Sequence, residues 1–557
     1  MKHQIQNFIK SFETRIFLER EKKNQLNNLH VNATHGKKLV VTLFLLCLIL
    51  SIGNAIFGHG VVVSNVSITG QNTTNGYTLV QFDISWDNSW RVSSGPENWD
   101  ACWVFVKYRL KTQTIWNHAT LNTSGHTAPA NSTISTPSDG KGIFIYRSAD
   151  LVQGSVSYPG TQLRWNYGID GIADDDSVEI CVFAIEMVYV PQGSFYVGDG
   201  TSVFLQGQFE SGTSGTPFQI TSEGALTLGG GVLGSLGNNN ASGMASVDNF
   251  NDATSQTLPA DFPKGYAGFY CMKYSITQEQ YVVFLNKLTR EQQNTRTATA
   301  LGVGTIAVTN RYVMSNSSTM SNRNGIRCDD PIDANDPITF YCDFNGNDTP
   351  NEAGDGQNIA CNYLSWGDLA AYLDWAALRP MTELEYEKAC RGNQSAVANE
   401  YAWGSTSITQ ATGISNSGAD NETASNAGAN CAYDNHASVP GPMRVGNFGQ
   451  GVNTRAGVGA SYYGIMELSG NLWERPVTVG IPPGRAFTGT HGNGSLDATG
   501  NADATNWPGT NGSGAGFRGG QFQTTPAQLR VSSRVSTNAA SGFRSWTNGG
   551  RGVRLEP

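Results

Sequence analysis

The sequence predicts an α+β fold in which a loop-rich domain with a few short helices follows an all-β, sandwich-like domain. Between residues 60 and 185, apolar residues alternate or run in short stretches rich in Val, Ile, Phe and Tyr, which is the pattern of strands. After residue 186, three helical periodicities stand among long tracts of Gly, Asn, Ser and Thr. The predicted organisation is therefore an N-terminal extension over 1–58, a β-sandwich-like domain over 60–185 and a loop-rich domain over 186–557.

The N-terminal extension has the order of a secretory signal. Two lysines precede an apolar stretch from Leu39 to Leu50 that is short for a membrane span, and Gly53 and Ala55 supply the small residues before a cleavage site. The alternative is an uncleaved anchor whose basic flank stays in the cytoplasm. We expect an exported protein, whether periplasmic, cell-surface or secreted, which contacts a membrane only if this segment is uncleaved.

The charge of the chain argues against a nucleic-acid partner. The net charge is −9, and because the first 38 residues hold eight Lys/Arg and three Glu, the rest carries −14. Binding to phosphates needs a basic face, which an acidic body does not offer.

An exported chain can oxidise its cysteines, and eight of the nine lie after the signal segment. Cys271 and Cys390 are equally well interpreted as small buried apolar residues. Connectivity cannot be read from the spacing alone. The candidate pairs are Cys102 with Cys181 and Cys328 with Cys342.

Three helices are predicted within the loop-rich domain. Residues 275–288 and 365–378 place apolar residues at helical spacing, and the first of these stretches opens with a capping box of Thr277 and Gln280. A third helix opens with Thr382 and Glu385 and stops at Gly392. Glu383 and Glu387 lie four residues apart on this third helix, and we interpret them as a solvated face rather than an acid/base pair.

Several stretches occur in the order found in the formylglycine-generating enzyme / sulfatase-modifying-factor family, which the chain resembles over about 186–557. This resemblance implies the family's α+β, loop-rich, C-type-lectin-like domain, and residues 60–185 fall outside it. The stretches are MVYVPQGSFYVG (187–198), FYCMKYSITQEQYVVFLN (269–286), the segment 363–392, YAWGS (401–405), YYGIMELSGNLWER (462–475), FRGGQF (517–522) and GGRGVRLEP (549–557).

The residues that perform the family's chemistry are absent. Oxidase members bind copper through two cysteines shortly after an RGGS turn, whereas this chain has Thr524 and Leu529 at the matching positions and no cysteine after Cys431. A hydroxyl and an isobutyl group cannot form the thiolate site that Cu(I) requires. We therefore expect no bound copper and no oxidase activity by the known mechanism. The alternative is an oxidase-type or other metal-dependent modifying enzyme that works without the cysteine pair.

A second catalytic branch, the iron-dependent sulfoxide synthases, uses a three-histidine centre on an added helical bundle. The histidines of this chain lack metal-ligand spacing, and the added region is predicted to be β. We interpret each histidine after the signal as a surface or loop residue. These are His118, His126, His436 and His491.

The resemblance implies a calcium site in the turn YYGIMELSGNLWERP (462–476). Carried over, the ligands are the carboxylates of Glu467 and Glu474 and the backbone carbonyls of Gly470 and Leu472. Hard oxygen donors on a flexible turn suit Ca²⁺. Glu467 is longer than the commoner Asp or Asn, and Arg475 replaces the family's second Trp. The alternative is an ordinary surface loop whose acids face water.

A second candidate for calcium is the loop YCDFNGNDTPNEAGDGQ (341–357), which crowds oxygen acceptors at alternating spacing. Its glycine falls at the wrong position for an EF-hand loop. A turn rich in Asp and Asn that binds no ion is the alternative. The candidate ligands are Asp343, Asn345, Asn347, Glu352 and Asp355.

What remains is a binding or structural module, stabilised by calcium, that binds a glycan or protein ligand at the cell surface. The predicted ligand surface combines hydrogen-bonding groups with aromatic faces; in the alternative, Phe543 and Trp546 belong to the core. A subunit of an extracellular assembly, such as gliding or secretion machinery, is a further candidate function. The surface comprises Arg530, Ser532, Ser533, Arg534, Asn538, Phe543, Trp546 and Asn548.

Export gives a direct prediction. The mature protein recovered from its native host should begin between about Ile56 and Gly60, because the small residues end the signal there. N-terminal sequencing measures this. Soluble cytoplasmic protein that starts at Met1 would refute export.

Overall fold

The computed structural model describes residues 60–95, 97–201, 207–238, 247–449 and 454–557, so the predicted signal segment lies outside the described residues. These described residues belong to one compact unit. No helix in these described ranges has the length and apolar character needed to cross a membrane.

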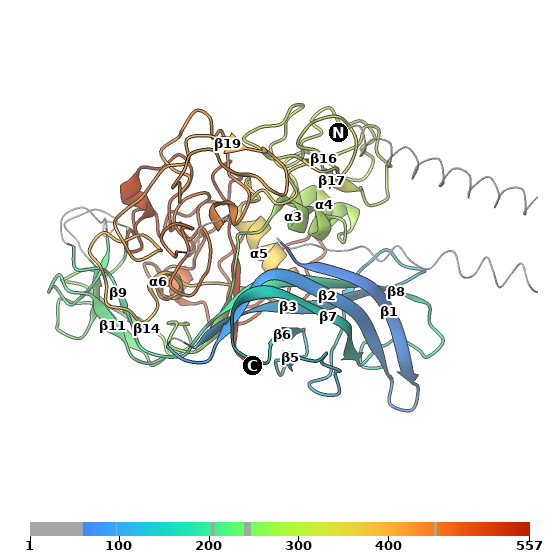
Figure 1. The fold of residues 1–557 in the computed structure, drawn as a ribbon, viewed down its shortest axis with the longest axis horizontal. Coiled ribbons are helices and arrows are strands. Elements are labelled where there is room, and N and C mark those ends of the chain that lie inside the picture. The colour runs from blue at the N-terminus through green and yellow to red at the C-terminus, as the bar shows by residue number, and fades with distance from the viewer. Residues whose placement is uncertain (1–59, 96, 202–206, 239–246, 450–453) are drawn as a thin grey trace, which may run out of the picture. The chain divides into compact units, whose positions relative to one another are not determined.

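An 11-stranded sheet organises the fold (Figure 1). Four strands lie off its main path: β7 (Leu151–Trp165) pairs with β2, β4 (Asn117–His118) and β6 (Ile143–Arg147) pair with β3, and β5 (Ser132–Ser135) pairs with β6. The main path runs in the order β1 (Val62–Asn72), β2 (Tyr77–Val92), β3 (Asn98–Leu110), β8 (Val178–Val190), β15 (Phe269–Met272), β21 (Gly552–Leu555) and β18 (Arg379–Pro380).

Strand β8 joins the two regions that the sequence predicts as separate domains. It pairs with β3 from Val178 to Val188, and its last four residues, Met187–Val190, also pair with β15. The predicted boundary at 185/186 therefore falls inside a strand. The physical reason is visible in VEICVFAIEMVYV, a mostly apolar run, interrupted only by Glu179 and Glu186, that has no turn residue at which the chain could leave the sheet.

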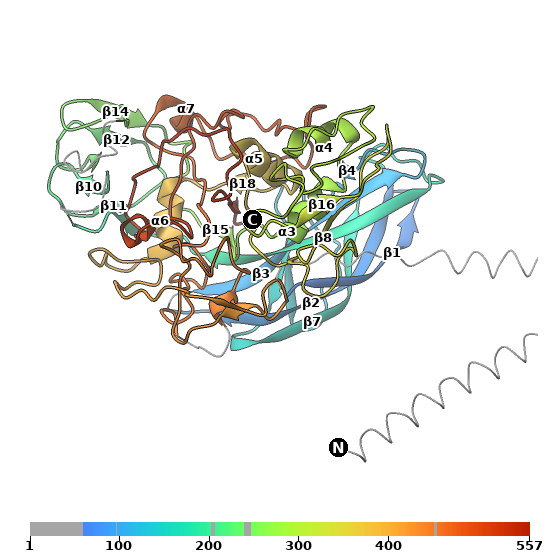
Figure 2. The same ribbon diagram turned by 90° about the horizontal axis from the view of Figure 1, so that it is seen from above.

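Strands β3 and β8 are buried on both faces. Along β3, Cys102, Val104 and Val106 face a hydrophobic cluster shared with β1, β2 and β7, while the alternate residues Trp103 and Phe105 face a cluster shared with the helices. Figures 1 and 2 show β1, β2 and β7 lying beside β3 and β8. The fold is thus mostly sheet, with few helices.

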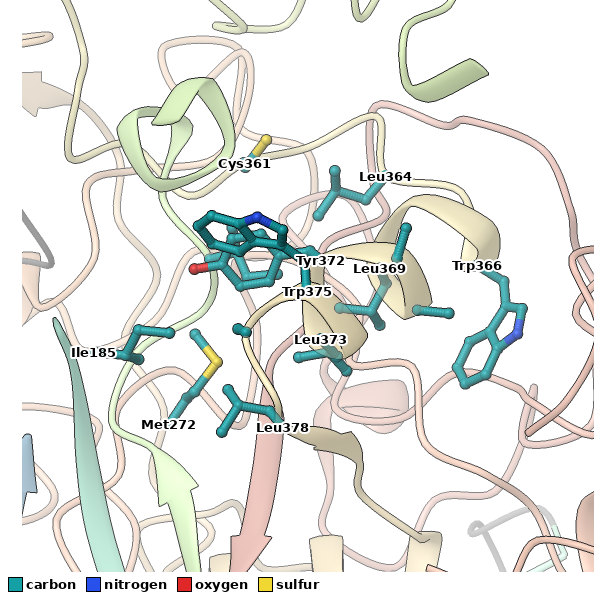
Figure 3. Close-up of a cluster of buried hydrophobic side chains, with 14 of the residues drawn as sticks. Ile185, Met272, Cys361, Leu364, Trp366, Leu369, Tyr372, Leu373, Trp375 and Leu378 are labelled. Carbon is teal, nitrogen blue, oxygen red and sulfur yellow. The ribbon is translucent and has the colours of Figure 1, made fainter. Parts of the chain in front are cut away.

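Helix α5 (Trp366–Trp375) packs on this sheet from the helix side. The ring of Trp375 meets Phe105 and Phe183 edge-on, at centroid distances of 5.3 and 4.9 Å. Figure 3 shows Tyr372, Leu373 and Trp375 of α5 beside Ile185 of β8 and Met272 of β15. Each such buried side chain contributes about 1.5–3 kcal/mol of transfer free energy.

All three predicted helices are present, each opened by a capping box: α3 (Gln278–Leu285), α5 and α6 (Glu383–Arg391), with Gly392 as the C-cap of α6. Helix α4 (Arg290–Arg296) was not predicted from the sequence, because its residues lack an apolar stripe. Thr289 and Gln292 nevertheless form the same capping box. The short α7 (Pro482–Arg485), η3 (Asn447–Gly449) and η4 (Pro526–Leu529) were also missed.

Short strands complete the fold in four small sheets. These strands lie in the loop regions and do not pair with the main sheet. They are β10 (Phe209–Ser211), β13 (Leu236–Asn238), β12 (Leu226–Gly229) and β14 (Ser255–Leu258); β9 (Phe195–Val197) with β11 (Phe218–Ile220); β16 (Ile326–Cys328) with β17 (Phe340–Cys342); and β19 (Ile414–Ser415) with β20 (Thr423–Ala424).

The predicted disulfides are wrong: the eight described cysteines are free thiols. On β8, Glu186 lies opposite Cys102, so Cys181 is five residues away along the strand. In the β16–β17 hairpin Cys328 pairs with Phe340 and Cys342 with Ile326, so these two cysteines are diagonal rather than opposite. Cys271 and Cys390 are fully buried, as the alternative interpretation has it.

Helix α6 is the centre of a buried ion-pair network, which corrects the interpretation of Glu383 and Glu387 as solvated. Both are fully buried. Glu383 accepts hydrogen bonds from Arg518 Nη1 (3.0 Å) and Arg534 Nε (2.8 Å), and also from the hydroxyls of Thr478 and Thr537. Burial alone would raise the pKa of Glu383, but the two guanidinium groups lower it to about 2.

The neighbouring glutamates of α6 extend this network. Arg379 binds Glu385 through two parallel hydrogen bonds of 2.8 and 2.6 Å. Glu387 accepts from Arg518 Nη2 at 2.6 Å and from the backbone N–H of Gly198 at 2.8 Å. One two-turn helix thus fixes segments from both ends of the loop-rich region.

Replacing Glu383 should therefore destabilise the fold strongly. Glu383→Gln leaves Arg518 and Arg534 without part of their compensating charge, and breaking a buried ion pair from one side costs about 3–5 kcal/mol. Denaturant unfolding at neutral pH measures the loss. The matched control is Glu291→Gln, because Glu291 also lies in the first turn of a helix, α4, but is exposed.

The pH dependence has a definite sign. Since the pKa of Glu383 is lowered from 4.5 to about 2, its contribution is fully present above pH 4.5 and is lost as the pH falls towards 2. The stability gap between wild type and Glu383→Gln should shrink across that window. A gap within error of the Glu291→Gln value at neutral pH would contradict the role assigned to Glu383.

Candidate functional site

The turn 462–476 brings its two predicted carboxylate ligands together around one arginine. Glu467 and Glu474 are both buried, at 5% and 1% exposure, so the alternative of acids facing water is excluded. Arg551 donates from Nε to Glu474 Oε1 (2.6 Å) and from Nη2 to the backbone carbonyl of Glu467 (3.5 Å). The backbone N–H of Gly446 donates to Glu467 Oε1 (2.6 Å).

Burial is the largest influence on the two carboxylates of the turn, although Arg551 and Arg444 lie near Glu467. Burial raises the pKa of Glu467 to about 7 and also raises that of Glu474, with Arg551 opposing both shifts. The Oε2 atom of each carboxylate is buried without a hydrogen-bond partner among the described residues. These two orphaned oxygens are hard donors that a divalent cation could take. The residues present therefore fit calcium, although the described residues contain no group of three His, Cys, Asp or Glu side chains that could hold a metal.

The backbone of the turn explains its residue types. Glu467 and Asn471 have left-handed φ values of +53° and +64°. Asn adopts this region readily, whereas the longer Glu does so rarely. Gly470 has no alternative, because a Cβ there would lie 2.3 Å from Cys431 Sγ. The left-handed backbone of Glu467 is therefore strained, and this strain occurs at the residue whose carboxylate points into the interior.

The N-terminal strands support this turn directly. Lys273 pairs with Glu186 of β8 (2.9 Å) and stands 3.9 Å from Asp100 of β3. The carbonyl of Lys273 accepts from Met466 N (2.9 Å), the residue before Glu467. Asn98 Nδ2 of β3 donates to Tyr463 O (2.8 Å). The position of the turn thus depends on the sheet formed by residues 60–190.

The second calcium candidate has its acceptors engaged by its own loop. The fully buried Asp343 accepts from the backbone N–H groups of Gly346 and Asn347 and pairs with Arg327. The remaining candidates bond one another: Asn345 Nδ2 donates to Asp355, Glu352 N donates to Asp355, and Asn347 Nδ2 donates to Glu352. These contacts favour the alternative, a turn closed by its own side chains.

Thr524 and Leu529 stand side by side at the positions matched to the oxidase cysteines. Both lie within 3 Å of the place where a Cβ on Gly520 would stand, Leu529 Cδ1 at 2.6 Å and Thr524 Oγ1 at 2.8 Å. Thr524 Oγ1 is bonded to both backbone groups of Gln521. Leu529 is fully buried in a hydrophobic cluster with Tyr401, Trp403 and Cys431.

The predicted ligand surface needs correction, because most of its residues are buried. Arg534 is enclosed by Glu383 and Asp248, and Ser532 accepts from Arg391 Nη2 (3.0 Å). Ser533, Asn538 and Asn548 are buried too. The cause is the α6 network, whose carboxylates recruit this segment inward. Arg530 is half-buried, and its Nε and Nη1 atoms are buried without a hydrogen-bond partner among the described residues.

The aromatic residues of the predicted surface are exposed and do not belong to the core. Phe543 is 82% and Trp546 45% exposed. The indole N–H of Trp546 donates to Gln523 Oε1 (2.9 Å), and Gln523 Nε2 donates to Asn435 Oδ1 (3.1 Å). Sequence reasoning missed Gln523 and Asn435. The available signal was that Gln523 stands next to Thr524, beside the family's reactive position.

The histidines are dispersed, as expected, but His118 is not a surface residue. It lies on β4, buried, with its ring stacked 5.6 Å from Phe105. His126, His436 and His491 are partly buried and lie outside strands and helices.

A comparison with protein-family models gives one match, to the sulfatase-modifying factor enzyme 1-like domain, over residues 239–554. A search of curated proteins gives no match. The matched residues make up more than half of the 557-residue chain and include α6, the 462–476 turn and the Thr524–Leu529 segment. The resemblance predicted from the sequence is confirmed, and the chain belongs to the sulfatase-modifying factor family.

Proposed function

We propose that this protein is an exported, catalytically inert member of its family that serves as a calcium-stabilised binding module at the cell surface, where it takes a glycan or protein ligand. The observation that carries the proposal is the pair Thr524 and Leu529. These side chains are neighbours at the matched reactive position, but neither is a thiol. The buried isobutyl group of Leu529 also fills the space against Cys431.

Cys431 does not replace the missing pair. It is a single buried thiol. Burial raises the pKa of this thiol well above its usual value, so the thiolate form is disfavoured. Soft Cu(I) sites need deprotonated sulfur ligands. One buried neutral thiol does not meet that requirement.

Catalytic inertness is tested with the full-length protein, copper, oxygen and a Cys-x-Pro-x-Arg peptide. No aldehyde should form above the blank, because the residues that would hold Cu(I) are absent. Mass spectrometry of the peptide measures the product. Copper-dependent turnover that survives repurification would overturn the assignment.

Ligand binding is supported by the exposed aromatic surface around Trp546. Its indole face is open to solvent while its N–H is held by Gln523, so the ring is fixed before a ligand arrives. Fixed aromatic faces beside amide groups provide stacking and hydrogen bonds at low entropic cost. Asn435 and the half-buried Arg530 extend the polar part of this surface.

Trp546→Ala should abolish binding while leaving the fold intact, because the ring is half exposed. A glycan array probed with labelled full-length protein measures binding, and thermal melting checks the fold. Val152→Ala is the matched control, since Val152 is an exposed apolar residue on β7. If both variants bind like wild type, the Trp546 surface is not the ligand site.

Calcium binding is supported by the two orphaned Oε2 atoms of Glu467 and Glu474. An ion there would add to the positive charge that Arg551 and Arg444 bring to the buried carboxylates and would tie the turn to Arg551, the residue before the C-terminal strand β21. Gly470 and Leu472 would contribute backbone carbonyls. The ion has no catalytic part in this proposal.

Removing calcium should therefore lower the melting temperature by a few degrees. At free calcium about a hundredfold above its dissociation constant, binding adds roughly 2.7 kcal/mol, and a large domain loses a few degrees for such a change. Differential scanning calorimetry with calcium and with EGTA measures the shift.

The double variant Glu467→Gln and Glu474→Gln is the matched comparison. It should melt lower than wild type in calcium and respond less to EGTA. Identical melting of wild type in calcium and in EGTA would mean that the turn holds no ion.

A further inference from the structure

One lysine lies buried between two carboxylates at the place where β3, β8 and β15 adjoin. Asp100 lies on β3, Glu186 lies on β8, and Lys273 follows the last residue of β15; the three strands are neighbours in the main sheet. The lysine Nζ lies 2.9 Å from Glu186 Oε2 and 3.9 Å from Asp100 Oδ2. Asp100 is 0% exposed, and Glu186 and Lys273 are 4% exposed. An amine and two carboxyl groups therefore meet where the protein excludes water.

The choice of lysine sets this site apart from the other ion pairs of the fold. Every other ion pair within the described ranges has an arginine as its cation. The guanidinium group stays charged in proteins, whereas a buried lysine can lose its proton and then acts as a nucleophile. Lys273 is thus a potential nucleophile beside two carboxyl groups.

The carboxyl group of Asp100 is fixed by donors on strand β2. Its Oδ1 accepts from the hydroxyl of Ser89 (2.7 Å) and the backbone N–H of Trp90 (3.1 Å), and its Oδ2 accepts from the indole N–H of Trp86 (2.8 Å). Two donors on one oxygen stabilise the negative charge that develops there when a nucleophile adds to the neighbouring carbon. Asp100 Oδ1 already has the donors that such an attack requires.

Aromatic rings cover the amine. The lysine Nζ lies 5.0 Å from the ring centre of Trp90 and 5.4 Å from that of Tyr274. To react, the flexible lysine side chain must turn from Glu186 towards Asp100 and bring its nitrogen to about 3–3.5 Å from the carboxyl carbon. The movement is short, because Nζ already lies 3.9 Å from Asp100 Oδ2.

The protonation of the two acids suits a proton transfer. Burial raises the pKa of Asp100 and raises the pKa of Glu186 to about 7, although the charge of Lys273 opposes both shifts. Glu186 can therefore accept and return a proton near neutral pH. Burial lowers the pKa of Lys273, but Glu186 and the other acidic groups around the amine outweigh burial and raise the pKa overall. The amine is thus an ammonium at rest, and its proton must pass to Glu186 before it reacts.

We propose that the amine of Lys273 and the carboxyl group of Asp100 condense into an intramolecular isopeptide bond, with Glu186 as the catalytic proton carrier. Glu186 takes a proton from Nζ, the neutral amine adds to the carboxyl carbon of Asp100, and the bond from that carbon to Oδ2 breaks. Of the three ammonium protons, one stays on the amide nitrogen and two leave with Oδ2 as water. Glu186 passes protons to the leaving oxygen and is itself not consumed, and no oxidant or further reactant is needed.

The buried site favours the amide over the separate ions. In water, hydration stabilises an ammonium and a carboxylate, and burial removes that hydration. Condensation takes both charges out of the interior. Glu186 then has no cation beside it, so burial keeps its carboxyl group protonated.

The bond would join the N-terminal strands to the family-matched region. It would link β3 to the residue whose backbone carbonyl accepts from Met466 N (2.9 Å), and so would fix the turn 462–476 to the sheet. Its formation is independent of the proposed binding function, because no residue of the Trp546 surface takes part.

Tryptic peptide mapping of the full-length protein tests the bond. Trypsin should release residues 92–107 and 265–287 as one linked species, lighter by one water than the sum of its two parts, because an acylated Lys273 is no longer a cleavage site. Fragment spectra should place the link between Lys273 and Asp100. Recovery of only unlinked 92–107 and 265–273 would mean that the three groups form an ion pair and nothing more, which overturns the proposal.

Glu186→Gln separates catalysis from packing, because it keeps the shape of the side chain and removes the proton carrier. The linked fraction should fall at least about tenfold in protein of equal age, and thermal melting shows whether the variant folds. Glu179→Gln is the matched control and should link like wild type, since Glu179 lies on the same strand but is half-exposed and pairs with Arg109. A folded Glu186→Gln protein that links like wild type would overturn the role of Glu186. If that variant does not fold, the wild-type map still decides whether the bond forms.

Discussion

The burial of the α6 carboxylates is the constraint on which the rest of this fold depends. Glu383, Glu385 and Glu387 can each be buried because an arginine from outside α6 forms an ion pair with them. Arg518 and Arg534 come from the C-terminal segment, and Arg379 comes from the strand before the helix. A buried ion pair is weak evidence for net stability, since replacing it whole by apolar groups is often neutral. Its effect here is on geometry, because bidentate guanidinium contacts allow few arrangements.

That geometry matters because regular elements are few after residue 190. The segment 480–557 contains only α7, η4 and β21 as named elements in its described residues. Loops of this length are costly to order through backbone hydrogen bonds alone. Fixing Arg518 and Arg534 on α6 sets the path between them, and Thr524 and Leu529 lie on that path. The same contacts therefore hold the fold and position the segment that contains Thr524 and Leu529.

The family match begins at residue 239, but the site does not depend on the matched residues alone. Glu186 and Asp100 engage Lys273, and Asn98 holds the carbonyl of Tyr463. Because β8 is shared by both halves of the sheet, a displacement of the N-terminal strands would reach the 462–476 turn through these contacts. The N-terminal region is thus part of the scaffold of the turn.

The sequence was sufficient for the elements whose signals are local. The three main helices were predicted because their signals, a capping box, an apolar stripe or both, lie within about a dozen residues of one another. The burial of Glu383 was missed because Arg518 and Arg534, which compensate it, are more than 130 residues away in the chain. The predicted disulfide pairs were wrong for a similar reason. The register between two paired strands decides which residues lie opposite each other, and a local stretch of sequence does not contain that register. Gln523 lies next to Thr524 in the sequence, but nothing local links Gln523 or Asn435 to Trp546, so that contact is visible only in the structure.

Strand-like alternation explains how one short segment serves two electrostatic environments. Glu474 pairs with Arg518 through both backbone hydrogen bonds, so the backbone here is extended and the side chains of Glu474 and Arg475 point in opposite directions. Glu474 faces Arg551 and the acidic turn, whereas Arg475 faces the ring of Phe517 and the carbonyls of Gly516 and Ser541. A tryptophan at position 475, as in the family motif, would fill the second side with an apolar ring. Arginine instead places a buried guanidinium group there, which has no acidic partner in the described part of the chain and is held by two backbone carbonyls and the ring of Phe517.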